Sequence, residues 1–547
     1  MRKRSRRVNN AMHPLSRYSH YSSSSITTHK KARSSTAVSI GFSRFLSGRY
    51  SIGVRASLTT SLFVWVSSST ALAQSNYADG RIETRSSNYA IAIGDWQIKP
   101  LLEIRSQAEL RHGPNDAKAS ANGDISSNAS SDASSTDLVA TTAMPALVDN
   151  QWWVLSRGRF GLAAERGPAS MVVELQDARY WGESSSMRFD LRDSLPSTSA
   201  RLAYAEIHGF GYRSSFVRLG RQQIEWGDGR LLGGADWSPT GRSLDALRGQ
   251  LVLGDFDIEA FASLLVGPGV VPVELQRGLP NTPGGNGVQL HGLRVAWHIA
   301  PLLNVESNNV GRIARQQNNA TVSPRDLFVS SLRISGSYPG ISYAVEGAYE
   351  LGNGASSGAS SSDEGPDRLR AWAVGGKARY EMGVLWNLGF GIEGAYSSGQ
   401  NSSSNVTRFE PVLPDTRPGI HHSGSGGAMG ILAWSNAIQG AGSVSISPSD
   451  DTLLILGYRY LALAEPDDMW RSASLVPVGS LPGNNDSLIG HELDARIEAA
   501  PWAPVDIVAG YSALLTGDGA KNVLEVQGLG RPNIQHYGYL QITMRMR

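Results

Sequence analysis

The sequence predicts an all-β protein, a transmembrane antiparallel β-barrel of about eighteen strands with long extracellular loops and short periplasmic turns. Three observations predict this fold. Apolar and charged residues alternate over segments of roughly 9–15 residues, at or above the roughly 9–11 that a tilted strand needs to cross a bilayer. The connections between these segments alternate between long polar stretches and tight turns. An export signal precedes them, and no apolar run of helical membrane-spanning length follows it.

Residues 1–73 are predicted to be a leader with a signal peptide at 54–73. Residues 56–73 carry no charge, Arg55 supplies a positive flank, Leu62–Val66 form an apolar centre, and Ala73 ends a small-residue cleavage site. The upstream residues are long for such a leader. A mis-assigned start, with translation beginning at Val54, explains them, and an extended export signal is the second interpretation. The predicted mature domain is 74–547, a single barrel in the outer membrane of a Gram-negative cell.

Charge is unevenly distributed along the chain. Twelve of the 50 Lys and Arg residues, and none of the 48 acids, lie in residues 1–55, so the remainder has 38 bases against 48 acids and a net charge of −10. Only four of those 38 bases are lysine. The chain has no cysteine, which excludes a disulfide framework in an exported protein. The mature domain is therefore mildly acidic, rich in arginine and large enough to fold without disulfides.

The segment 96–111 gives the clearest strand pattern. Its even positions are mainly apolar, and its odd positions are mainly charged or amide side chains, as in Glu103-Ile104-Arg105. Successive side chains of a strand point to opposite faces, so one face is apolar and the other polar. The same alternation returns in later segments, which include 341–351, 372–380, 386–396, 492–498 and 505–515. A bacterial single-chain barrel has an even number of strands, and eighteen fits the segments present.

The connections divide into two kinds. Tight turns are predicted at 165–168, 210–214, 254–257, 339–340 and 501–504, and long polar loops at 112–150, 182–198, 268–288, 352–368, 397–428, 465–487 and 517–532. Short turns on one side and long loops on the other are typical of outer-membrane barrels.

Few residues resemble catalytic machinery. Eight histidines follow the leader, and none lies in a recognisable nucleophile or metal motif. His421-His422 lies in a glycine- and serine-rich stretch, where a solvated pair is favoured over a metal site. Glycine-rich pieces lack the Lys-Ser/Thr of a phosphate-binding loop. We therefore expect no enzyme activity, no cofactor, no metal and no nucleic-acid partner. An outer-membrane hydrolase is kept as a third interpretation.

Arginines mark the expected lumen, because an arginine facing lipid at mid-membrane costs about 2–4 kcal/mol. The planar guanidinium matches carboxylates, so an arginine-rich lumen suits a uronate polymer. Inward acids, such as Glu103 and Glu174, leave a second interpretation, an internal ion-pair network that fills a wide barrel. The predicted path comprises Lys99, Arg105, Arg157, Arg159, Arg221, Arg242, Asp245, Arg248, Arg294, Arg379, Arg459 and Arg496. Arg221 departs from the alternation of its neighbours, so its inward position requires a bulge.

The segment 220–249 carries a recognisable motif: Gly220-Arg221-Gln222, then Gly227-Asp228-Gly229-Arg230-Leu231, Asp236-Trp237, Gly241-Arg242, Asp245 and Arg248. This pattern resembles the signature of the alginate-export family of outer-membrane β-barrels. The similarity is densest across 199–252, and it is weaker in 452–499 and in the last strand. The motif residues carried over from the family are Gly220, Asp228, Arg230, Asp236 and Trp237. The resemblance implies about eighteen strands, an electropositive constriction and loops that plug it.

The sequence thus predicts a channel that exports an anionic exopolysaccharide, alginate or a similar acidic polymer, through an arginine-lined lumen. The alternative is an uptake porin for small anionic nutrients such as sugar acids. Expected partners are outer-membrane lipid, the anionic polysaccharide and periplasmic secretion-complex proteins, and the barrel is expected to be monomeric. The polymer, the direction of transport and the gating loop are left open by the sequence.

Overall fold

The computed structural model of the chain describes residues 90–113, 151–182, 197–209, 215–266, 288–314, 326–354, 367–383, 386–401, 406–415, 427–475, 477–502 and 504–546. The predicted leader and His421-His422 lie outside these residues. Among the described residues, no helix has the length and hydrophobicity needed to span a bilayer.

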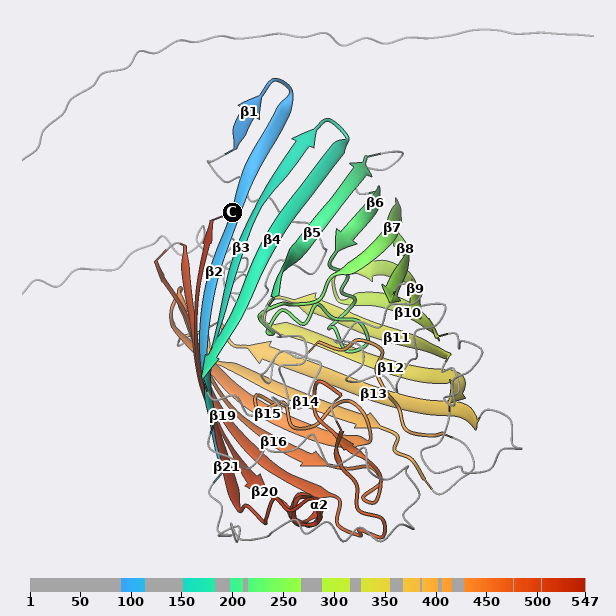
Figure 1. Ribbon diagram of the computed structural model, residues 1–547, viewed down its shortest axis with the longest axis vertical. Helices are drawn as coiled ribbons and strands as arrows, with labels where there is room; N and C mark the ends of the chain where they lie inside the picture. Colours follow the sequence, from blue (N-terminus) through green and yellow to red (C-terminus); the bar gives the residue numbers. More distant parts are fainter. Residues whose placement is uncertain are drawn as a thin grey trace, which may run out of the picture. The chain divides into compact units, whose positions relative to one another are not determined.

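Eighteen antiparallel strands form one closed sheet (Figure 1). Each strand from β2 to β16 pairs with the next, β16 pairs with β19, and β21 returns to pair with β2. The predicted fold class and strand number are therefore confirmed. The strands are β2 (Trp96–His112), β3 (Gln151–Arg166), β4 (Ala169–Gly182), β5 (Ser197–His208), β6 (Phe216–Gln222), β7 (Leu244–Leu253), β8 (Phe256–Val266), β9 (Val288–Ala300), β10 (Leu303–Ala314), β11 (Leu327–Tyr338), β12 (Ile341–Gly354), β13 (Asp367–Glu381), β14 (Gly389–Ser397), β15 (Ala437–Ser449), β16 (Thr452–Ala462), β19 (Leu488–Trp502), β20 (Val505–Thr516) and β21 (Ile534–Met546).

Three short strands and one helix add to this ring. β1 (Ile91–Ile93) pairs with the start of β2, and β17 (Trp470–Arg471) pairs with β18 (Pro477–Gly479) within the connection between β16 and β19. Helix α2 (Asp518–Val526) lies in the connection between β20 and β21. β1 and α2 lie at opposite ends of the ring of strands (Figure 1).

The outer face of the barrel wall is apolar and its inner face is polar, which is the reverse of the arrangement in a soluble protein. Along β2 the buried residues include Glu103, Arg105 and Gln107, whereas Ile104 and Leu110 are exposed. Arg105 is 4% exposed and Leu110 is 54% exposed. Lipid replaces water at the outer face, so apolar side chains belong there, and the charged side chains must find partners inside. The alternation read from the sequence is the pattern that separates these two environments.

Long and short connections alternate along the chain, as predicted. Two-residue turns join β3 to β4, β7 to β8, β9 to β10, β11 to β12 and β15 to β16. At Gly167 and Gly254 the turns need φ of +56° and +61°, a left-handed conformation that glycine adopts without steric cost. The other ends of the strands are joined by the long connections. The sequence did not identify 223–243 as one of them, although it singled out the same residues as a motif.

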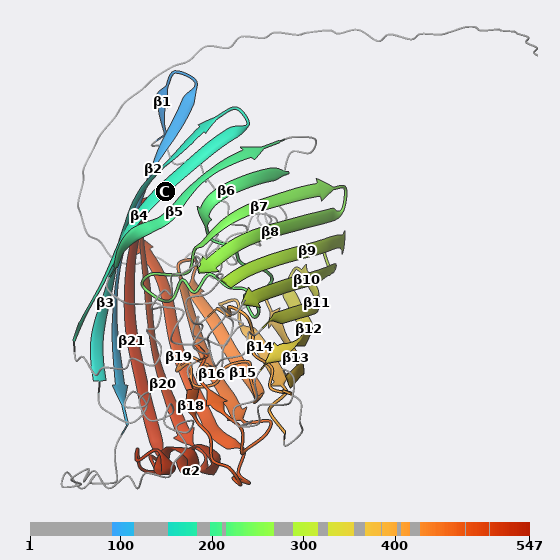
Figure 2. The same cartoon turned by 45° about the vertical axis from the view of Figure 1, so that its right-hand side comes forward.

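The connection 223–243, between β6 and β7, folds into the ring of strands (Figure 2). It meets the connection between β14 and β15 through a parallel bridge between Leu232 and Leu413. Ile224, Trp226 and Leu232 belong to one apolar cluster with inward residues of β7 to β13. A second cluster joins Met429, Trp470, Ile489 and α2. The described interior is thus filled by inward-folded connections and is not lined by strands alone.

Candidate functional site

The inward connection 223–243, named the inner loop here, is fixed by its own backbone. Gly233 N donates to Leu413 O at 2.8 Å, Leu413 N donates to Leu231 O at 2.9 Å, and Asp415 N donates to Gly229 O at 2.8 Å. Close approach explains some of its glycines, because a Cβ at Gly233 would lie 2.5–2.8 Å from atoms of Asp415. The inner loop therefore presents its side chains to the opposite barrel wall from a defined position.

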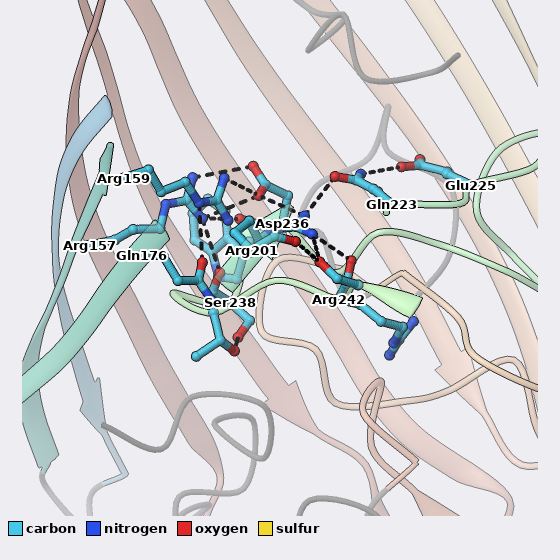
Figure 3. A network of polar contacts seen from close by, with 12 residues as sticks. Arg157, Arg159, Gln176, Arg201, Gln223, Glu225, Asp236, Ser238 and Arg242 are labelled. Atoms are coloured by element: carbon cyan, nitrogen blue, oxygen red, sulfur yellow. Dashed lines mark hydrogen bonds and ion pairs between the residues drawn. The ribbon is translucent and has the colours of Figure 1, made fainter. Parts of the chain in front are cut away.

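Three arginines from that wall, Arg157, Arg159 and Arg201, surround the carboxylate of Asp236 in the inner loop (Figure 3), and a fourth, Arg105, binds the backbone beside it. Arg159 Nη1 lies 3.0 Å and Arg157 Nη1 3.3 Å from Asp236 Oδ1, and Arg201 Nη2 lies 4.0 Å from the same oxygen. Arg105 donates to the carbonyl oxygens of Asp236 at 2.6 Å and of Trp237 at 2.8 Å. We call Arg105, Arg157, Arg159 and Arg201 the arginine cage. Its members come from β2, β3 and β5: strand alternation turns Arg105, Arg157 and Arg159 inward, and a bulge turns Arg201 inward.

Further carboxylates of the wall contact the same arginines. Glu103 Oε1 lies 2.5 Å from Arg157 and 3.6 Å from Arg159, and Glu174 lies 4.0 Å from Arg159. Glu103 also pairs with Arg545 at 3.0 Å, which in turn pairs with Asp506. The four arginines of the cage thus meet three carboxylates, two of which belong to the wall. Without the carboxylate that the inner loop contributes, the positive excess of the cage would be larger.

The ionisation of Asp236 depends on the cage. Burial alone would raise the pKa of its carboxyl, but Arg157, Arg159, Arg105 and Arg201 outweigh burial and hold this pKa well below its ordinary value. Asp236 is therefore a charged carboxylate in a water-poor site, held by guanidinium groups.

A second ionic group fastens the other part of the inner loop. Asp228 lies 3.1 Å from Arg333 and 3.0 Å from Lys377. Burial would raise the pKa of Asp228, but Lys377, Arg333 and Arg230 lower it below its usual range. Arg230 pairs with Glu393 at 3.2 Å and lies over the ring of Trp434, with 5.3 Å between the guanidinium carbon and the ring centroid. Asp228 and Arg230 of the family motif therefore anchor the inner loop to the strands.

The remaining motif residues also have structural roles. Gly220 ends the regular part of β6 with φ +123°, and a Cβ there would lie 2.3 Å from Ala203 O, so no larger residue fits. Trp237 packs edge-on against Tyr539 with ring centroids 5.1 Å apart. The motif residues thus allow the inner loop to enter the barrel and dock against its strands.

Most predicted lumen arginines lie inside and contact acids. Arg248 pairs with Glu259, Arg294 with Glu306, Arg379 with Glu381, Arg459 with Glu393, and Arg496 with Glu498, at distances of 2.8–3.2 Å. Lys99 is half-buried on the inner side of β2. Arg242 belongs to the inner loop, where it donates to the carbonyl oxygens of Gly233 and Leu413. A continuous arginine-lined path is not confirmed by these contacts, because nearly every guanidinium has a protein partner.

Arg221 and Asp245 are a correction to the predicted path. They pair with each other at 3.1 Å, their side chains are 40% and 62% exposed, and they share the outer face with Leu219 and Leu247. The predicted bulge does not occur, because the register between β5, β6 and β7 runs without a shift. Both residues lie where their strands meet the inner loop, at the end of the wall, where an outward ion pair is tolerated.

Sequence reasoning missed Arg201. A bulge opposite Glu174 and Leu175 changes the alternation of β5 and turns Arg201 inward. The signal available was its position within 199–252, the segment where the family resemblance is densest. Gln223 was also missed, and its Oε1 accepts from Arg201 at 2.6 Å.

A closed barrel with an apolar outer face and a charged interior defines an outer-membrane β-barrel channel. The model of the family described as "Alginate export" matches residues 146–527, and the chain belongs to this alginate-export family. A comparison with curated protein sequences gives no match.

The comparison with solved structures gives matches of low sequence identity. Acinetobacter baumannii OccAB1 has 8% sequence identity and a TM-score of 0.49, with 84% of this chain and 100% of that chain covered. Pseudomonas aeruginosa OccK5 (OpdH) has 9% identity and a TM-score of 0.45, covering 82% and 99%. The outer membrane protein OprD from Pseudomonas aeruginosa has 9% identity and a TM-score of 0.45, covering 84% and 96%.

Proposed function

We propose that this outer-membrane channel exports an anionic exopolysaccharide, alginate or a related polyuronate, and catalyses no reaction. The observation that carries the proposal is the binding of one carboxylate, that of Asp236, by the arginine cage. A uronate residue offers the same group. Guanidinium groups bind carboxylates with matched planar geometry and remain charged at any physiological pH.

Transport requires that a polymer carboxylate is held and then released. The wall carboxylates Glu103 and Glu174 lie within 4.0 Å of the cage and reduce its net positive charge. A site of mixed charge would therefore hold a polyanion weakly enough for it to move on, as conduction demands. The driving force would come from polymer synthesis and from periplasmic secretion-complex proteins acting on a monomeric barrel.

Uptake of small anions such as sugar acids is the second candidate. The inner loop and the connection after β14 meet inside the barrel at Leu232 and Leu413, and a filled interior favours a small solute. The same arginine cage would select its carboxylate. The two candidates differ in the length of the ligand that occupies the lumen.

The test is single-channel conductance of the refolded mature chain in a planar bilayer, with salt-gradient reversal potentials and added oligouronate. Arg105→Gln is the variant of choice, since Arg105 bonds to carbonyl oxygens and its loss leaves no carboxylate without its closest partner. We expect anion selectivity in the wild type, and weaker oligouronate block in Arg105→Gln. Arg221→Gln, on the outer face, is the matched control.

Three outcomes discriminate the candidates. Block that grows with oligomer length supports polysaccharide export. Block by a monomeric sugar acid alone supports the uptake channel. Cation selectivity in the wild type, or equal block in Arg105→Gln, would reject the arginine cage as a ligand site.

A further inference from the structure

A band of aromatic rings and imidazoles lies on the outer face of five neighbouring strands. Its members are His112, Tyr458, His491, Tyr511 and His536, which we call the His–Tyr band. His536 Nδ1 lies 2.7 Å from the Tyr511 hydroxyl, and His491 Nδ1 lies 2.7 Å from the Tyr458 hydroxyl. His112 stacks on His536 with ring centroids 5.9 Å apart.

Strand register places the members of the band within two residues of one row across the five strands. Tyr458 pairs with Leu493, Leu493 with Ala513, Ala513 with His536, and His536 with His112. This row crosses β16, β19, β20, β21 and β2, near the strand ends that lead to long connections. Long connections are extracellular in outer-membrane barrels, so the band lies at the outer leaflet.

The His–Tyr band differs in chemistry from the rest of the outer face of these five strands. Below it the outward residues of the same strands are mainly apolar, and include Leu456, Leu540 and Ile542, which are 45–62% exposed. On the described outer faces of these five strands, no other outward side chain can carry a positive charge. The Nε2 atoms of His491 and His536 have no hydrogen-bond partner within the described part of the chain.

The next strands around the barrel, from β4 to β7, carry outward ion pairs in place of such a band. Outward charges at their long-connection ends neutralise each other, as in Arg179 with Asp177 at 2.7 Å and Arg221 with Asp245 at 3.1 Å. Within the described part of the chain, the imidazoles of the band have no such carboxylate. A polar N–H left without an acceptor beside acyl chains is costly, so an external acceptor would stabilise these rings.

We infer that the His–Tyr band binds phosphate groups of outer-leaflet lipid. The acyl chains of that lipid would cover the apolar wall below the band, and its phosphates would lie at the level of the imidazoles. Each tyrosine hydroxyl that donates to Nδ1 leaves the ring proton on Nε2, where it can be donated to a phosphate oxygen. His112 and His536 stack on each other and His491 lies two strands away, so the band offers donors at two separate positions. Two such positions suit a lipid with more than one phosphate, such as the phosphorylated lipid A of lipopolysaccharide.

The test is binding of bis-phosphorylated lipid A to the purified mature protein, measured by native mass spectrometry, beside lipid A with both phosphates removed. The variant is His112→Phe with His491→Phe and His536→Phe, which retains ring shape and removes the donors. We expect about tenfold weaker binding of the phosphorylated lipid, with unchanged conductance. His291→Phe is the matched control, because His291 is outward at a long-connection end of β9 and bonds to Gln289.

Two results would overturn the inference: equal binding of the phosphorylated lipid by the triple variant, or equal binding of both lipids by the wild type. Binding of inorganic phosphate alone at the three histidines, with no preference for lipid, would reject the lipid as the occupant. If the triple variant fails to assemble, His536→Phe alone is measured, for which we expect a loss of about threefold.

Discussion

The two parts of the inner loop are fastened differently: apolar burial supports the ion pairs of Asp228 and Arg230 in the first part, whereas the ion pairs of Asp236 dominate the last part. Its first part buries Ile224, Trp226, Leu231 and Leu232 against inward apolar residues of β7 to β13. Its last part places Asp236 in the arginine cage of β2, β3 and β5. Apolar burial has no replacement partner in an aqueous lumen. An ion pair can be replaced, because any carboxylate of similar geometry can take the place of Asp236. The ionic end is therefore the end that a polyuronate could release.

The largest effect is expected from Arg157→Met. Arg157 is 1% exposed and contacts both Glu103 and Asp236, so its removal leaves two buried carboxylates without a major partner. Breaking a buried ion pair from one side costs about 3–5 kcal/mol. We expect the free energy of unfolding, measured by urea titration in lipid vesicles, to fall by this amount.

The matched control for Arg157→Met adds Glu103→Gln and Asp236→Asn. If the loss arises from unpaired charge, the triple variant regains part of the stability of the wild type. An equal loss in the single and triple variants would instead assign the effect to packing of the arginine side chain.

Leu232→Ala tests the apolar end. Leu232 is fully buried and bridges to Leu413, so truncation leaves a cavity in the cluster that holds the inner loop. We expect a loss of about 2–3 kcal/mol, because a loop can partly close the space. Hydrogen exchange at Gly233 N, which bonds to Leu413 O, measures the release of the loop. Unchanged exchange would show that this end does not depend on Leu232. Val217→Ala on the outer face is the control.

Asp236→Asn tests whether the ionic end limits conduction. The change keeps the shape of the side chain and removes the negative charge, so the cage gains a net positive charge and loses its internal carboxylate. We expect higher conductance for anions and tighter block by oligouronate, by roughly tenfold for one charge-assisted contact. Equal block in both proteins would show that Asp236 and the polymer do not compete. If no oligouronate binds to either protein while anion conductance still rises, Asp236 closes the lumen without a polymer ligand.

The same residue predicts a pH dependence. The folded protein lowers the pKa of Asp236, so its contribution to stability is fully present above the ordinary aspartate pKa of about 4 and is lost as the pH falls toward the lower value of the folded state. The difference in conductance between the wild type and Asp236→Asn is therefore expected to stay constant from neutral pH down to about pH 4. It should disappear only well below that pH, where Asp236 itself becomes protonated.

The comparison also explains what the sequence could predict. Along β2, the alternation in the sequence correctly assigned Glu103 and Arg105 to the inner face and Ile104 to the outer face, because successive side chains of a regular strand point to opposite faces. The docking of the inner loop could not be predicted in this way, because a loop has no periodic sequence pattern. Arg105 and Arg157, which contact Asp236, lie 131 and 79 residues away from it in the sequence. Arg201 was missed because one bulge reverses the parity of a strand.

The smallest effect is expected from Arg221→Gln with Asp245→Asn, and this pair sharpens the boundary between the lumen and the outer face. Both side chains are largely exposed and lie at strand ends, where an ion pair contributes less than about 1 kcal/mol. If the pair lies outside, reversal potentials and oligouronate block match those of the wild type, although the sequence motif that contains Arg221 also contains Asp236. If anion selectivity falls as it does in Arg105→Gln, the lumen extends to these strand ends, and the outward position of the pair does not hold in the membrane.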